Sequence, residues 1–383
     1  MKTFFLPFFL VALAASAQPN LDGGRFETVP AAGNLGEAVR QAGRGGQPVW
    51  VSWTVPVIEG QGYSCCLSRD WKPDTCRLEA KNQSSGSNDN DPRQDPYINV
   101  LVRLEGGKVE RVRRVSATCP LDAGGRRFVW LEGVKPEESV RFLTELVKSG
   151  PGIASGASGK GDDAGEEALD ALAFHRNAGA LAALTDFATS PRYREDVREQ
   201  SLFWLGQTRG REGYEVVARV LREDKDDELR EHATFALSES PVPEAAELLL
   251  KTARADRTPD VRSQAMFWLA QIDHPQAPAT ILEAIAKDAD PEVRSQAMFW
   301  LAQIDHPQAP ALILEAIAKD ADEEVREQGV FALSQLPKGK GVPLLIKLGR
   351  ESKDREVRKQ ALFWLTESDD PAAVAFLEKM LAQ

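Results

Sequence analysis

The residues best suited to redox or metal chemistry are four cysteines, which all lie in the first third of the chain: Cys65, Cys66, Cys76 and Cys119. An even number of cysteines favours two disulfides in a protein that enters an oxidising compartment. A bridge between the adjacent Cys65 and Cys66 would close a strained ring. We therefore expect one of them to pair with Cys76 and the other with Cys119, and the sequence leaves open which. A four-thiolate metal site is the alternative, but the paired C-x-x-C spacing of such sites is absent.

Residues 1–17 have the features of a removable signal peptide. Met1-Lys2 supplies a positive charge, an apolar run extends from Phe4 to Ala15, and Ala15-Ser16-Ala17 is a small-x-small cleavage site. A membrane anchor needs about 18 apolar residues, and Gln18 ends this run too soon. No second run of that length follows. We expect a bacterial-type exported protein, periplasmic or extracellular, without a membrane anchor.

Other catalytic signals are weak. Of the four histidines, His274 and His306 occupy the same position in two nearly identical segments, so a duplication accounts for both. No serine or cysteine stands in a G-x-S-x-G frame, and no glycine-rich loop could cradle a phosphate. We expect no catalytic residues, no metal and no cofactor.

The negative charge is concentrated in the C-terminal part of the chain. Residues 151–383 hold 28 Lys and Arg against 41 Asp and Glu, a net charge of −13. Such a surface repels phosphate backbones, so the charge argues against a nucleic-acid partner.

An internal repeat organises the region from about residue 160 to residue 383. Residues 263–294 and 295–326 differ at only two positions, Thr280 against Leu312 and Pro291 against Glu323. An aliphatic residue followed by arginine recurs at a constant spacing of 32, at Val197-Arg198, Leu229-Arg230, Val261-Arg262, Val293-Arg294, Val325-Arg326 and Val357-Arg358. One frame earlier, residues 166–175 lose the Val-Arg pair, as expected of a terminal capping repeat. The period predicts seven units.

Each unit contains two helical stretches. In one unit we expect a first helix, helix A, over Asp260–Ile272 and a second helix, helix B, over Pro278–Lys287, separated by the helix-breaking Asp273-His274-Pro275. Neither helix can bury its apolar face alone. Stacking of neighbouring units must therefore supply the core.

The pattern D-x-x-x-V-R-x-x-A-x-x-x-L-x-x-I, followed by a second helix rich in Leu and Ala, resembles HEAT-like repeats of the phycobilisome-lyase type. The resemblance covers the whole repeated region. It implies a mainly α fold, a right-handed α-solenoid of seven 32-residue helical hairpins over residues 166–383. It says little about function, because such repeats serve many partners.

Two enzymatic interpretations come with the resemblance. HEAT-like di-iron hydroxylases carry His-Glu dipeptides on successive helices, whereas this chain has only the reversed Glu231-His232. Bilin-lyase chemistry belongs inside cyanobacterial cells, which disagrees with a signal peptide. A HEAT-like oxidoreductase or lyase therefore remains only as an alternative.

One side of helix A is predicted to be core. At about 100° per residue, Ala265, Trp268, Leu269 and Ile272 lie within about 60° of one direction. The tryptophan position recurs as Trp204, Trp268, Trp300 and Trp364. We interpret this stripe as packing between helices rather than as a ladder for sugars or aromatic ligands.

A column of phenylalanines lies about 145° from that core direction, at Phe203, Phe235, Phe267, Phe299, Phe331 and Phe363. A continuous apolar ridge can mark a partner-binding surface. The alternative is that the rings pack into grooves between adjacent A helices. The sequence does not decide between the two.

Polar columns border the phenylalanines. One column contains Gln264 and Gln296, and a second, seven residues further on, contains Gln271 and Gln303. Stacked amides could hydrogen-bond to one another or bind a partner. The Arg column, with Asp226, Asp290, Asp322 and Asp354 four residues before their arginines, predicts Asp–Arg ladders between neighbouring repeats.

The segment 18–149 does not share the period and predicts a small α+β domain with two disulfides. Strands are expected over Pro48–Pro56 and Arg127–Leu131, a hairpin over Ile98–Val115 with a Gly106-Gly107 turn, and a helix from Pro136 to Lys148. Residues 150–165 have the composition of a Gly/Ser-rich flexible linker.

Together these features predict a protein–protein interaction scaffold rather than an enzyme. Its partner would be a protein bound through the solenoid. The remaining alternative is a ligand-binding or catalytic N-terminal domain with the solenoid as a docking arm.

Overall fold

The computed structural model describes residues 19–22, 25–31, 33–60, 63–67, 73–80, 85–87, 94–149, 164–304 and 306–382. The chain divides into two compact units, Met1–Val197 and Arg198–Gln383. The predicted signal peptide and residues 150–163 of the predicted linker lie outside the described residues. No helix within the described ranges is long and apolar enough to cross a membrane.

A five-stranded mixed sheet forms the centre of the first unit. Its strand order is β2 (Arg25–Pro30), β11 (Arg127–Glu132), β3 (Val49–Pro56), β8 (Tyr97–Glu105) and β9 (Lys108–Ser116). The pairs β2–β11 and β11–β3 are parallel, and the remaining pairs are antiparallel. Gly106 and Gly107 both have positive φ, which allows the two-residue turn between β8 and β9 that the sequence predicted.

Alternating residues of β3 face two different layers. Trp53 packs edge-on against Phe142 of α2 (Pro136–Ser149), and α1 (Leu35–Ala42) also contacts β3. Trp50, which points to the other face, joins the buried cluster that contains all four cysteines. Short strands complete this second layer: β1 (Leu21–Asp22), β10 (Leu121–Asp122), β6 (Cys76–Arg77), β4 (Ser64–Leu67), β5 (Pro73–Asp74) and β7 (Ser85–Ser87).

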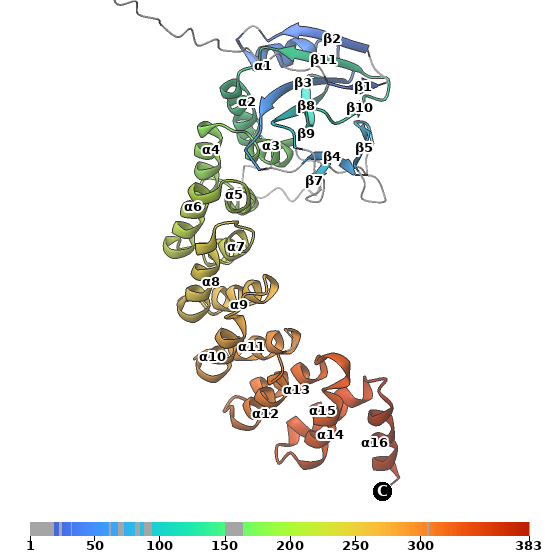
Figure 1. Ribbon diagram of the computed structural model, residues 1–383, viewed down its shortest axis with the longest axis vertical. Helices are drawn as coiled ribbons and strands as arrows, with labels where there is room; N and C mark the ends of the chain where they lie inside the picture. The colour runs from blue at the N-terminus through green and yellow to red at the C-terminus, as the bar shows by residue number, and fades with distance from the viewer. Residues whose placement is uncertain are drawn as a thin grey trace, which may run out of the picture. The chain divides into compact units, whose positions relative to one another are not determined.

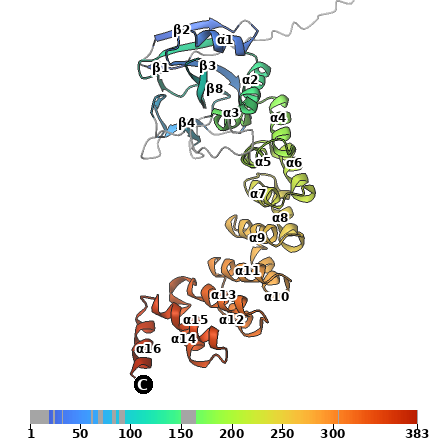
Figure 2. The ribbon, with the colours of Figure 1, turned by 180° about the vertical axis from the view of Figure 1, so that it is seen from behind.

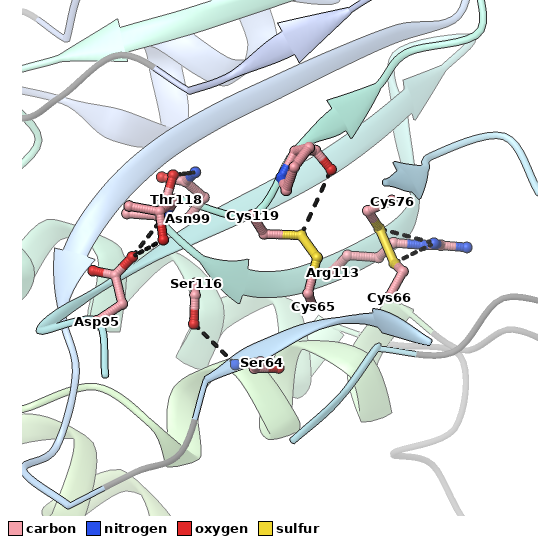
Figure 3. The surroundings of a disulfide bond; sticks show 12 residues. Ser64, Cys65, Cys66, Cys76, Asp95, Asn99, Arg113, Ser116, Thr118 and Cys119 are labelled. Carbon is pink, nitrogen blue, oxygen red and sulfur yellow. Dashed lines mark hydrogen bonds between the residues drawn. A yellow bond between two sulfur atoms is a disulfide. The ribbon is translucent and has the colours of Figure 1, made fainter. Parts of the chain in front are cut away.

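The two disulfides confirm the predicted partners and resolve the pairing. Cys65 joins Cys119, and Cys66 joins Cys76, with Cα–Cα distances of 5.5 and 4.8 Å. Successive side chains of a strand point to opposite faces, so the adjacent cysteines of β4 reach different partners. Figure 3 shows the two bridges next to β4, with Arg113 beside the Cys66–Cys76 bridge.

The first helical hairpin belongs to the same unit as the sheet. Helix α3 (Ala164–Ala173) packs on α2 and β9, and α2 and α3 lie side by side in both views (Figures 1 and 2). The turn after α3 is tied to the end of β3, because Arg176 N–H donates to the Pro56 carbonyl and Ile58 N–H to the Phe174 carbonyl. Helix α4 (Ala178–Thr189) completes the hairpin. The capping repeat is therefore built into the N-terminal domain.

The remaining helices alternate as A and B helices along the chain (Figure 1). The A helices are α5 (Glu195–Thr208), α7 (Asp227–Ser238), α9 (Pro259–Gln271), α11 (Pro291–Gln303), α13 (Glu323–Ser334) and α15 (Arg355–Thr366). The B helices are α6 (Gly210–Glu223), α8 (Pro243–Ala255), α10 (Ala277–Lys287), α12 (Ala309–Lys319), α14 (Val342–Glu351) and α16 (Pro371–Leu381). With α3 and α4 these helices make the seven predicted hairpins.

Candidate partner-binding surface

From α5 to α13, an arginine near the start of each A helix binds the turn that follows the next helix B. Arg294 donates to both carboxylate oxygens of Asp320, at 2.7 and 2.9 Å, and to the carbonyl of Asp288 at 3.0 Å. Arg262 does the same with Asp288 and the carbonyl of Asp256. Asp288 and Asp320 are the C-cap residues of successive B helices. Arg262 and Arg294 therefore each link the ends of two B helices.

The Asp–Arg ladder between repeats is confirmed, but most of the predicted aspartates have another role. They accept hydrogen bonds from backbone N–H groups of their own helices as N-caps, at Asp226, Asp290, Asp322 and Asp354. The arginines mainly bind the aspartate that stands two residues before the N-cap. Asp354 and Asp226 are exceptions, because they also accept from Arg326 and Arg198.

The first amide column also connects neighbours, though not through amide stacking. Gln264 Nε2 donates to Glu231 at 2.8 Å, and Gln360 Nε2 donates to Glu327 at 3.2 Å. Gln296 accepts from the Ser263 hydroxyl at 2.6 Å. In each pair the partner is the residue just before the equivalent position of the previous repeat, which is His232, Gln264 or Gln328. These partners were not predicted, although their spacing is regular.

Ten aromatic rings form a continuous ladder along the A helices of the second unit. Neighbouring rings have centroid separations of 4.5 to 5.8 Å, a range in which aromatic pairs attract. In order of contact, this aromatic ladder consists of Trp204, Phe203, Phe235, Trp268, Phe267, Trp300, Phe299, Phe331, Trp364 and Phe363.

The ladder stays continuous because phenylalanine compensates for missing tryptophans. Phe267 contacts Trp300, which belongs to the next repeat. Where the next repeat has alanine at that position, as at Ala332, the ring contacts the following phenylalanine instead. Phe299 and Phe331 are stacked with an interplanar angle of 6°. One aromatic contact therefore crosses each junction between the A helices.

The rings are neither fully exposed nor fully buried. Five of the six phenylalanines are half-buried, and Phe363 is 50% exposed. The packing between A helices that the sequence left open is therefore present, and partner binding by the same rings stays a prediction. The rings pack against neighbouring A helices, and each leaves part of its surface accessible.

The predicted core direction of helix A was wrong in part. Trp268 is half-buried and Ile272 is 39% exposed, whereas Met266 is fully buried. Helix α9 packs against α8, α10 and the neighbouring A helices α7 and α11, so its buried arc is centred closer to Met266. The tryptophans therefore lie at the margin of the core and belong to the ladder.

The second amide column lies outside the core, next to the aromatic ladder. Gln271 and Gln303 are both exposed at the ends of their A helices. Their equivalents Glu239 and Glu367 are also exposed. The described A helices thus present an apolar ladder bordered by amides and carboxylates.

One buried hydroxyl–imidazole pair was not predicted from the sequence. Ser139 Oγ lies 2.7 Å from His175 Nε2, and it accepts a hydrogen bond from Trp53 Nε1 at 2.8 Å. His175 Nδ1 lies 2.8 Å from the carbonyl of Ala171, which can only accept, so this nitrogen carries the proton. Ser139 and His175 are fully buried. The pair resembles a nucleophile and its base, but its burial makes it a tie between α2 and the α3–α4 turn.

The described ranges contain grooves but no cluster of metal ligands. No group of three His, Cys, Asp or Glu side chains within them could hold a metal ion. A groove of about 340 Å³ runs between α1 and α2 and includes Arg40 and Arg141, without a histidine or cysteine in its lining. A larger groove of about 660 Å³ lies between the B helices α10 and α12, lined in part by Leu282, Ile285 and Leu312.

A family model described as HEAT repeats matches residues 191–266, 246–334 and 311–383, which together make up half of the chain. The chain belongs to the HEAT-repeat family. The N-terminal domain lies outside these matches, and a search of curated proteins finds no matching sequence.

Solved structures that are similar to this HEAT-repeat protein have low sequence identity. Human deoxyhypusine hydroxylase is 18% identical, with 64% of this chain and 90% of that chain covered and a TM-score of 0.29. The CpcE–CpcF phycocyanin lyase of Nostoc is 21% identical, with 41% and 99% covered and a TM-score of 0.32. Kap121p bound to Ste12p is 15% identical, with 61% and 27% covered and a TM-score of 0.42.

We expect the arginine junction to make the HEAT array sensitive to acid. The hydrogen bond from Arg294, opposed by burial, holds the pKa of Asp320 below its ordinary value of 3.8. A lowered pKa stabilises the folded state above about pH 4, and this contribution is lost as the pH falls below about 4. We predict that Arg294→Gln lowers the free energy of unfolding by about 2 kcal/mol at pH 7 and reduces its dependence on pH below about 4. Urea unfolding followed by circular dichroism measures both.

The matched control for this substitution is Arg355→Gln. Arg355 is exposed at the start of α15, so its loss should change the free energy of unfolding little. Equal losses for the two variants would contradict the role of the junction.

The nearly identical repeats predict that the array tolerates loss of one whole unit. Deletion of residues 295–326 removes one full period, so Arg294 takes the place of Arg326 and Phe267 faces Phe331. Both kinds of contact already exist in the array. We expect a folded protein with proportionally less helical signal that keeps the cooperative melting transition of the wild type.

Deletion of residues 295–322 is the control, because it is shorter than one period and breaks the register of the repeats. It should lose the cooperative transition. Equal behaviour of the two deletions would show that the register of the junctions does not determine stability.

Proposed function

We propose that this protein is an exported scaffold that binds a protein partner through the aromatic ladder of its HEAT repeats. The observation that carries the proposal is the continuity of the half-buried rings across six A helices. A ladder needed only for packing could be fully buried, whereas this one leaves ring surface accessible beside exposed Gln271 and Gln303. Large apolar surface bordered by polar groups is typical of partner-binding sites.

The proposal is for binding rather than catalysis. Two of the similar structures are named as a hydroxylase and a lyase, so some HEAT-type proteins are enzymes. In this chain the regular features of the array are contacts between repeats and an aromatic ladder. These features favour a surface that a partner can follow over several repeats.

Export is a part of the proposal. Its support is the signal-peptide pattern of residues 1–17 together with two disulfides, which persist in oxidising compartments. We predict that the chain with a C-terminal tag, expressed in a Gram-negative bacterium, is recovered from the periplasm or medium with Gln18 as its first residue. Ala17→Arg should block cleavage. Recovery of the uncleaved wild-type chain in the cytoplasm would contradict export.

The partner-binding role is tested by removing rings from the middle of the ladder. We predict that Phe267→Gln with Phe299→Gln weakens capture of the native partner at least tenfold, because the two rings contribute apolar contact area that glutamine cannot replace. Crosslinked affinity capture from the cell envelope measures the effect, and circular dichroism verifies the fold.

The matched control is Leu282→Gln with Leu314→Gln. These two half-buried leucines are also one period apart, but they lie on the B helices. The control variant should capture the partner as the wild type does. If both double variants lose the partner equally, or if the phenylalanine variant retains it, the ladder is not the binding surface.

A further inference from the structure

The accessible face of the A helices contains an unbroken acidic column in addition to the ladder. The residue just before each aliphatic-Arg pair is acidic in all six repeats: Asp196, Glu228, Asp260, Glu292, Glu324 and Glu356. At about 100° per residue, Asp260, Gln264, Phe267 and Gln271 lie within about 60° of one another. Carboxylates, amides and rings therefore share one face.

Among the described residues, cations pair with this column only at its two ends. Asp196 pairs with Arg194, and Glu356 pairs with Lys359 at 3.0 Å. In the middle, Glu228, Asp260 and Glu324 are exposed, and no cation pairs with them among the described residues. The central part of the column is therefore open to a partner.

Neighbouring groups on the same helices do not neutralise the central carboxylates. Arg262 lies about 160° around the helix from Asp260, and it is engaged by Asp288. Glu292 accepts from the neutral Gln296 amide at 3.0 Å. The face thus pairs aromatic surface with uncompensated negative charge, and a cationic partner complements it.

The spacing of the face limits the conformation of that partner. Packed helices lie about 8 to 10 Å apart. Successive repeats therefore present a part of the aromatic ladder and one carboxylate of the acidic column at about that interval. An extended β-strand covers this interval in three residues, but its side chains alternate between two sides. A polyproline II helix has three residues per turn and rises about 9 Å per turn. Every third side chain of such a segment therefore meets the same row of the A-helix face.

We propose that the A-helix face binds a basic, proline-rich segment in the polyproline II conformation. This inference rests on the proposed binding function and specifies its partner. One row of prolines lies on the aromatic ladder, and a second row of lysines or arginines reaches the acidic column. The backbone of polyproline II has no internal hydrogen bonds, so its carbonyls can accept from the exposed Gln271 and Gln303 amides. Its stiffness also lowers the entropy lost on binding.

A synthetic peptide with six Pro-Lys-Pro repeats tests the inference on the mature full-length chain. Its length of about 56 Å matches six repeats at the expected spacing. Binding is measured at low salt by the change in fluorescence of the ladder tryptophans, including Trp268 and Trp300. We expect saturable binding that weakens as salt increases, and no binding of the corresponding Pro-Glu-Pro peptide.

A flexible Gly-Lys-Gly peptide of the same length and charge separates conformation from charge. It should bind at least tenfold more weakly than the Pro-Lys-Pro peptide. Equal binding of the two would overturn the inference, because charge alone would then suffice.

Charge reversal locates the peptide on the A-helix face. Glu292→Lys with Glu324→Lys should weaken binding of the Pro-Lys-Pro peptide at least tenfold. Glu283→Lys with Glu315→Lys reverses two exposed charges on the B helices and should change binding less than twofold. Equal weakening by both pairs would overturn the assignment to this face.

The outcomes also separate this inference from the proposed function. If the peptide does not bind, but Phe267→Gln with Phe299→Gln still abolishes capture of the native partner, the ladder binds a partner of other chemistry. The polyproline inference then fails, and the binding function stands. If the peptide binds and native capture is unaffected by the ring substitutions, the proposed function fails instead.

Discussion

The arginine junction is the interaction on which the geometry of the array depends. Arg294 holds the Asp320 carboxylate and the Asp288 carbonyl together, so the ends of two successive B helices cannot shift relative to helix A. The same junction fixes how far each A helix is displaced from the next. The hydrogen bonds of the glutamines and the contacts between the rings lie further along the same helices. Their geometry follows from that displacement. Because Arg294 and Asp320 are mostly buried, solvent screens this contact less than it would a surface pair.

The aromatic ladder both joins neighbouring A helices and leaves an accessible apolar surface. Its rings contact one another across every junction of the A helices, and they remain partly accessible. Complete burial would give more packing free energy, since stabilisation grows with the apolar area removed from water. The array instead keeps a regular apolar strip next to uncompensated carboxylates. Regular spacing of this kind suits a long partner, because each repeat adds a similar contribution to binding.

The constant period predicted the repeats because every unit must present the same contacts to its neighbours. Strict alternation and turn residues likewise predicted β3 and the β8–β9 hairpin. The partial exposure of Trp268 and Ile272 could not be predicted from the helical periodicity. The angular calculation assumes a single buried face, whereas helix A packs against several neighbouring helices. The pairing of the cysteines depends on which face of β4 each cysteine occupies, and this is set by the strand register. The contact of Ser139 with His175 joins two helical segments through their packing and has no local signal.

The local nature of the junctions explains how the array could contain two nearly identical units. The arginine, glutamine and ring contacts each join one repeat to the next, so a duplicated unit arrives with every contact that it needs. Thr280 and Leu312, one of the two differences between the copies, face different neighbours. Arg254 donates to the Thr280 hydroxyl at 3.0 Å, whereas the residue equivalent to Arg254 one period on is Ala286. Leu312 is instead half-buried beside the groove between α10 and α12, which Ala286 also lines. The two copies thus differ at a position where the neighbouring repeat also differs. This indicates that the unit of stability in this array is the junction between repeats rather than the isolated hairpin.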